Sequence, residues 1–214
     1  MSRERINWAR REREALCDLF DEVGPATATL CEGWTTADLA AHLVVRESRP
    51  DAAAGILIAP LAAHGEKVRR HVAARPWSEL VDEVRSGPPH WSPMRIEALD
   101  RATNTTEFFV HHEDVRRARA VWTPRLLDDE FDRELVAALR RGIRLTMRRA
   151  PSGVVLHIEG HETLTAKKGE PSVTVSGAAG EIVLFCFGRQ AHADVELSGD
   201  AATVDRLRSA HLGI

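Results

Sequence analysis

Cysteine and aromatic side chains are scarce in this chain of 214 residues, and neither sign of charge dominates it. The three cysteines, Cys17, Cys31 and Cys186, are odd in number and widely spaced. This pattern argues against a disulfide framework and against a cysteine-based zinc site, so we expect buried free thiols. The 29 basic and 32 acidic residues leave a net charge of −3 at pH 7. Without an overall positive field, nucleic acid is a poor candidate partner.

Long apolar stretches are absent as well. No segment approaches the roughly 18 consecutive apolar residues that a membrane-spanning helix needs. The first residues, Met1–Arg5, are charged rather than apolar, which is unlike a secretory signal. We therefore expect a soluble, cytoplasmic protein without a membrane span.

The hydrophobic periodicity changes once along the chain, at Ala150–Gly153. Residues 1–150 are expected to form an up-and-down helical bundle of about four main helices, and residues 151–214 a small α+β domain. The expected helices cover residues 5–23, 35–50, 76–87, 94–120 and 128–149, with a weaker helical region at 51–74 that Pro60 interrupts. Short strands are expected at 154–158, 173–175, 182–187 and 195–197, followed by a helix at 202–210.

Two polar residues lie on an apolar face of the helix expected at 94–120. Glu107 and His111 are four positions apart, so they lie within about 40° of each other on the helical wheel. Val110 and Phe108 flank the pair on either side. Burying an unpaired carboxylate is costly, and the cost is normally offset by a partner or a metal.

The second expected helix repeats this arrangement. Thr35 and Asp38 have the spacing of a capping box at its start, and His42 lies between Leu39 and Val45 on a face expected to be buried. Two helices that each direct ligand-type side chains inward are typical of a metal site in a bundle. Two neutral imidazoles and one carboxylate suit zinc first, with iron(II) or nickel possible, and leave a coordination position open for a reactant.

Other interpretations of these residues remain open. A Glu-x-x-x-His pair is common by chance, and Glu107 could instead form a buried ion pair with Arg46 or Arg49. His112 is expected behind the ligands or at the surface. Asp114 lies near the ligand face and could accept the outer N–H of a metal-bound imidazole.

Two segments resemble signatures of a known family. Residues Leu30–Leu43 (LCEGWTTADLAAHL) and Asn104–Ala118 (NTTEFFVHHEDVRRA) are similar to the two signatures of the DinB-like metal-binding bundles, in the mycothiol-dependent maleylpyruvate isomerase group. The resemblance implies that His42, Glu107 and His111 hold a divalent metal, usually zinc. It also implies a low-molecular-weight thiol such as mycothiol as cofactor, and Arg46 is our candidate cofactor-binding residue.

The resemblance extends to the end of the chain. Residues Val173–Leu207 look like the small sterol-carrier-like domain that follows the bundle in this group. By this similarity Arg189 is the candidate catalytic residue, because a guanidinium matches a substrate carboxylate bidentately. The alternative is that Arg189 is a surface arginine at a turn.

These observations lead to competing hypotheses about function. The first is a metal-dependent isomerase or transferase in which an external thiol attacks a small electrophile, since Cys31 precedes the helix cap and Cys186 lies in an apolar strand. The second is a non-catalytic module that binds an apolar ligand or lipid and has a structural metal. The third is a metal-free bundle in a protein complex. We expect a monomer or a homodimer.

Overall fold

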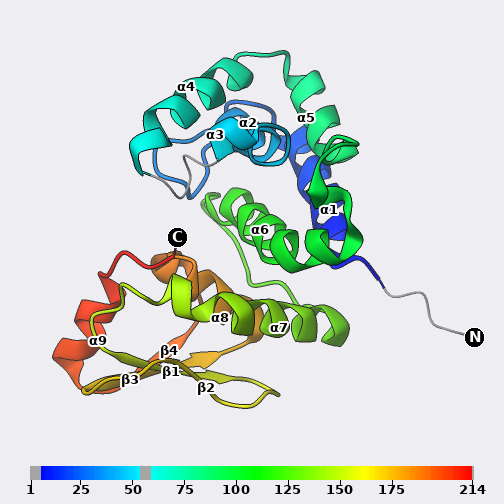
Figure 1. Cartoon of the computed structure of the whole chain (residues 1–214). Coiled ribbons are helices and arrows are strands. Elements are labelled where there is room, and N and C mark those ends of the chain that lie inside the picture. The colour runs from blue at the N-terminus through cyan, green and yellow to red at the C-terminus, as the bar shows by residue number, and fades with distance from the viewer. Residues whose placement is uncertain (1–5, 54–58, 214) are drawn as a thin grey trace, which may run out of the picture. The chain divides into compact units, whose positions relative to one another are not determined.

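The computed structural model describes residues 6–53 and 59–213, and the chain divides into two compact units between Trp122 and Thr123 (Figure 1). The first unit is helical. Its α-helices are α1 (Trp8–Val23), α2 (Thr36–Ser48), α3 (Pro50–Ala53), α4 (Ala62–Ala73), α5 (Trp77–Ser86) and α6 (Glu97–Arg117), with short 3-10 turns η2 (Ala59–Leu61) and η3 (Pro93–Arg95). No helix in the described ranges is long and apolar enough to cross a bilayer.

The core of the first unit lies between α1, α2, α5 and α6. Helix α1 packs against α5 and α6, while α2 packs against α4 and α5. Fully buried side chains from all four of these helices meet in the core, among them Leu16, Phe20, Leu39, Leu80 and Phe108. Burial of this apolar surface is the main favourable contribution to the fold, at about 25 cal/mol for each Å² removed from water.

The second unit is a small α+β structure. It contains α7 (Asp129–Thr146), β1 (Gly153–Ile158), β2 (Leu164–Lys167), β3 (Ser172–Gly177), α8 (Ala179–Cys186), the 3-10 turn η4 (Gln190–His192), β4 (Glu196–Ser198) and α9 (Ala201–Arg208). The sheet order is β2-β1-β3-β4. Strands β1 and β3 are parallel, with Val154 opposite Val173, and the outer pairs are antiparallel. Helices α7 and α8 lie on the same side of this sheet (Figure 1).

One expected strand is a helix in the structure. Residues 182–187 were expected to be extended, but Ile182–Cys186 belong to α8, in which every side chain is buried. A short continuous apolar run is compatible with a buried strand or a buried helix, because it shows no polar face. The strand β2, at Leu164–Lys167, is an element that the sequence pattern did not reveal.

Helix α7 lies on the other side of the unit boundary from the one that the sequence pattern indicates. The sequence places the change from bundle to α+β domain at Ala150–Gly153, whereas the compact units divide between Trp122 and Thr123. Helix α7 has a strongly one-sided apolar face that includes Phe131, Leu135 and Leu139. It packs on α8 and β2, so its contacts join it to the second unit.

The capping box expected at the start of α2 is present in the structure. The Thr35 side chain accepts from the backbone N–H of Asp38, and the Asp38 carboxylate accepts from the backbone N–H of Thr35 at 2.9 Å. Asp38 is also paired with Arg69 of α4, whose guanidinium lies over the Trp34 ring at 4.6 Å. These contacts fix where α2 begins and therefore the direction in which His42 points.

Replacing Thr35 by alanine tests this cap. We expect Thr35→Ala to lower the free energy of unfolding by about 1 kcal/mol, because the first turn of α2 loses a side-chain acceptor. Urea denaturation followed by circular dichroism measures the change. The exposed Glu32 of the same loop provides the control, and Glu32→Gln should change stability by less than about 0.5 kcal/mol. Equal stabilities for Thr35→Ala and the control would contradict this role of the cap.

Candidate metal centre

Three side chains from two helices converge in the first unit. His42 comes from α2, while Glu107 and His111 lie one turn apart on α6. The Nε2 atoms of both histidines lie 3.3 Å from the same oxygen, Oε1 of Glu107. The two imidazole rings meet edge to face with centroids 5.3 Å apart. The structure thus brings together the three residues that the two sequence signatures single out.

Two of the separations between these atoms match the spacing of donors around a tetrahedral ion. Donors that bind such an ion at roughly 2.0–2.2 Å lie about 3.4 Å from one another. Both nitrogen-to-oxygen separations at Glu107 are 3.3 Å, and the donor atoms of the three residues all lie within 4.8 Å of one another. The exposed fractions of the side chains are 14% for His42, 21% for Glu107 and 11% for His111, so the site is shielded without being closed. Nitrogen and oxygen donors in this ratio suit zinc and similar divalent ions.

Asp114 fixes the orientation of one imidazole. Its Oδ2 lies 2.9 Å from Nδ1 of His111, and its side chain is fully buried. Because a carboxylate only accepts, Nδ1 is the donor, and Nε2 is the nitrogen directed at Glu107. This is the outer contact expected for Asp114 from the sequence, and it is the usual partner of a metal-binding histidine.

The protonation states follow from burial and from the neighbouring charges. Burial lowers the pKa of His42, so this imidazole is neutral near pH 7 and can bind a metal ion through a nitrogen. Burial alone would raise the pKa of Glu107, but Arg46, His111 and His42 hold it well below its usual value. For His111, burial opposes the charged form, yet contacts with Asp114, Cys31 and Glu107 raise its pKa well above the usual value. A cation that binds here therefore displaces a proton from His111.

An arginine holds the carboxylate from the other side. Nε of Arg46 lies 3.2 Å from Oε1 of Glu107, and the same guanidinium donates to the Asn104 side chain and to the Thr103 carbonyl. Of the two arginines proposed as ion-pair partners of Glu107, Arg46 is therefore the one in contact, while Arg49 pairs with Asp51. These contacts position Arg46 beside the donor set, and its role in binding a cofactor remains a prediction.

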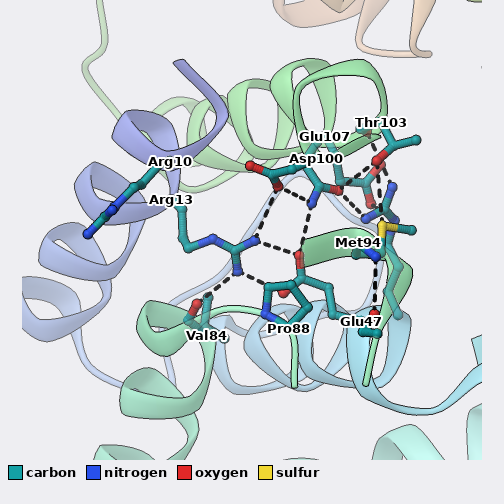
Figure 2. A network of polar contacts seen from close by, with 12 residues as sticks. Arg10, Arg13, Glu47, Val84, Pro88, Met94, Asp100, Thr103 and Glu107 are labelled. Carbon is teal, nitrogen blue, oxygen red and sulfur yellow. Dashed lines mark hydrogen bonds and ion pairs between the residues drawn. The ribbon is translucent and has the colours of Figure 1, made fainter. Parts of the chain in front are cut away.

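Asn104, which accepts from Arg46, belongs to a buried polar network in which Glu47 of α2 meets Arg13 of α1 (Figure 2). Asn104 donates to Glu47 at 3.0 Å and to Asp100 at 2.7 Å. Arg13 donates to both oxygens of Glu47, at 2.6 and 2.7 Å, and to the Val84 carbonyl at 2.9 Å. The network links α1, α2, α5 and α6, so the backbone positions that carry the three donors are fixed by charge pairing as well as by apolar packing.

Removing one member of the Arg13–Glu47 pair tests the network. We expect Glu47→Gln to lower the free energy of unfolding by about 3 kcal/mol, because the buried guanidinium of Arg13 loses its bidentate carboxylate and keeps only the longer contact with Asp100, at 3.8 Å. Chemical denaturation measures the loss. The matched control is Glu14→Gln, which breaks the exposed ion pair of α1 with Arg10 and should have an effect of about 0.5 kcal/mol or less. A similar small effect for both variants would show that the buried pair does not hold the helices together.

Cys31 is the neighbour of the site that sequence reasoning missed. Its Sγ lies 3.3 Å from Oδ2 of Asp114, and its thiol also interacts with His111. The loop that carries Cys31 reaches α6 because the backbone N–H of Leu30 donates to the Asp114 carbonyl at 3.0 Å. The signal available in the sequence was the position of Cys31 within the same signature segment as His42.

His112 and Arg189, which the sequence analysis also singled out, do not belong to the set of three donors. His112 is buried, and its Nδ1 lies 3.1 Å from Glu12 of α1, so the surface alternative for this residue is wrong. Arg189 belongs to the second unit, where its guanidinium donates to the Phe187 carbonyl at 2.6 Å. The sequence pattern predicts a central strand before Arg189, but in the structure Arg189 follows the helix α8. Its catalytic role remains a prediction.

Comparisons with known proteins find the fold of this chain in solved structures. No protein-family model matches the chain, and no curated protein matches it. Two solved structures do: the crystal structure of the mycothiol-dependent maleylpyruvate isomerase, and that of a variant of this enzyme with a histidine replaced by alanine. Each is 20% identical in sequence, aligns over 91% of both chains and has a TM-score of 0.60. The chain is therefore a two-part α and α+β protein with the fold of that isomerase.

Replacing the orienting carboxylate tests the donor set. We expect Asp114→Asn to weaken zinc binding by about 10- to 100-fold, because the imidazole of His111 is no longer held by a charged acceptor. Competition with a chromophoric chelator measures the affinity. In the unsubstituted protein zinc affinity should also fall as the pH is lowered, since the raised pKa of His111 keeps a proton on the donor nitrogen. Unchanged affinity in Asp114→Asn would contradict this role of Asp114.

Proposed function

We propose that the protein is a divalent-metal-dependent enzyme, with zinc as the first candidate, that uses a low-molecular-weight thiol to isomerise or transfer a small electrophile. The convergence of His42, Glu107 and His111 at the spacing of tetrahedral donors is the observation that carries this proposal. The likeness of the fold to a mycothiol-dependent isomerase supports the choice of thiol chemistry.

Each side chain in and around the donor set has a distinct role. His42 offers a neutral nitrogen, and Glu107 stays ionised and offsets positive charge. Asp114 holds the ring of His111 in one orientation, and Arg46 limits the rotation of the Glu107 carboxylate. Zinc in such a site would favour the thiolate form of a bound thiol, which is the nucleophilic form.

The cysteines of the chain favour an external nucleophile. Burial raises the pKa of Cys17 to about 12, and it raises the pKa of Cys186 as well, so both remain thiols at neutral pH. The thiol of Cys31 is hydrogen-bonded to the buried carboxylate of Asp114. We therefore assign the nucleophile to an external thiol of the mycothiol type.

The substrate class follows from this nucleophile. A thiolate adds to an activated double bond, the resulting single bond rotates, and elimination restores both the double bond and the thiol. The thiol is therefore regenerated in an isomerisation and consumed in a transfer. In this scheme Arg189 would bind a carboxylate of the substrate, because its planar guanidinium suits bidentate pairing.

The test combines metal, thiol and substrate. We expect purified protein loaded with zinc to isomerise maleylpyruvate, our first probe, only when mycothiol is added. Glu107→Gln should lose stoichiometric zinc and at least about 100-fold of the activity, since a charged donor is removed. Glu97→Gln, at the exposed first turn of the same helix, is the matched control and should retain both.

The possible results separate the two parts of the proposal. Full zinc stoichiometry in the double variant Glu107→Gln/Cys31→Ser, which also lacks the neighbouring thiol, would contradict the metal assignment. Stoichiometric zinc in the unsubstituted protein without thiol-dependent turnover of maleylpyruvate or of other electrophiles would contradict the enzymatic role and leave the metal assignment in place.

A further inference from the structure

A second set of metal-type donors lies directly behind the first. Cys31 Sγ, the imidazole of His111 and the carboxylate of Asp114 also lie within 4.8 Å of one another. His111 belongs to both sets through different nitrogens: Nε2 is 3.3 Å from Glu107 Oε1, and Nδ1 is 2.9 Å from Asp114 Oδ2. The two sets therefore share a single ring.

The local fold builds this second set. The backbone N–H of Leu30 donates to the Asp114 carbonyl, which ties the loop to α6. The backbone of Cys31 is held on both sides, since its N–H donates to the Thr29 hydroxyl at 3.2 Å and its carbonyl accepts from Trp34 at 2.9 Å. Cys31 is partly exposed while His111 and Asp114 are buried, so Cys31 is the most accessible of the three residues.

The donor separations are close to those of a coordinated ion. Nitrogen, oxygen and sulfur donors at roughly 2.0–2.3 Å from a tetrahedral ion lie about 3.4–3.6 Å apart. Sγ of Cys31 is 3.3 Å from Oδ2 of Asp114, and Nδ1 of His111 is 2.9 Å from the same oxygen. Side-chain movements of about half an ångström would therefore admit a cation. Because a thiolate is a soft ligand, this set should prefer thiophilic ions.

We propose that Cys31, Nδ1 of His111 and Asp114 form a second cation position, selective for thiophilic divalent ions. Binding there replaces the S–H proton of Cys31 and the Nδ1 proton of His111, and both protons pass to solvent. The position competes with the first donor set because a neutral imidazole offers only one unprotonated nitrogen: with an ion on Nδ1, the ring proton of His111 lies on Nε2, which faces Glu107. A thiophilic ion would thus disturb the first site while leaving His42 and Glu107 in place. The inference does not depend on the reaction proposed above.

Cadmium binding to a variant that lacks one donor of the first set tests the proposal. In metal-free His42→Ala, cadmium should produce thiolate-to-cadmium absorption in the ultraviolet that saturates at one equivalent. The double variant His42→Ala/Cys31→Ser should show no such absorption, and its cadmium affinity should be at least tenfold weaker. Adding Asp114→Asn to His42→Ala should also weaken cadmium binding at least tenfold, because the set then loses its charged oxygen donor. Circular dichroism verifies that each variant is folded, and Glu107→Gln provides a second background if His42→Ala is not.

The results either support or overturn the second position. Absence of thiolate absorption at saturating cadmium in a folded His42→Ala protein would overturn it. Absorption that persists after Cys31→Ser would overturn it too, because the sulfur donor would then be another cysteine. Zinc affinity of the single variant Cys31→Ser reports on the first donor set alone, since that variant keeps His42, Glu107 and His111. Loss of the first site and loss of the second are therefore distinguishable.

Discussion

The carboxylate of Glu107 is the point on which the site depends. A single oxygen of this partly buried group meets the Nε2 atoms of His42 and His111 and the guanidinium of Arg46, all within 3.3 Å. An ionised carboxylate in such a place is stable only when opposite charge surrounds it. The ion pair with Arg46 and a bound cation are therefore not strict alternatives: Arg46 keeps the carboxylate ionised and in position, and the histidines supply neutral donors once a cation replaces the proton on His111.

The rest of the first unit serves to bring α2 and α6 to this carboxylate. The capping box at Thr35 and Asp38 fixes the start of α2, and the buried Arg13–Glu47 pair with Asn104 links both helices to α1. Such polar contacts add geometric definition that apolar packing alone does not provide. The loop before α2 completes the arrangement by placing Cys31 against Asp114. The imidazole of His111 thereby faces a carboxylate at each of its two nitrogens, Glu107 at Nε2 and Asp114 at Nδ1.

Local sequence signals predicted the helices and the donor face, and nonlocal contacts explain what was missed. Helix boundaries follow caps, glycines and prolines, and the wheel positions of Glu107 and His111 follow from spacing alone. The apolar run at 182–187 was misread because a buried helix and a buried strand share that pattern. The contact of Cys31 with Asp114 joins residues 83 positions apart through a loop, and no periodicity predicts such a contact. The partner of α7 was likewise set by tertiary packing on α8.

The most direct measurement is anomalous diffraction from crystals grown with zinc, recorded at X-ray energies on both sides of the zinc edge. The account predicts an anomalous peak bonded to Nε2 of His42, Nε2 of His111 and a carboxylate oxygen of Glu107, with a further coordination position occupied by solvent or thiol. Zinc bound to other residues, with the Glu107 carboxylate still in contact with Arg46 and both imidazoles and without a metal ion, would contradict it.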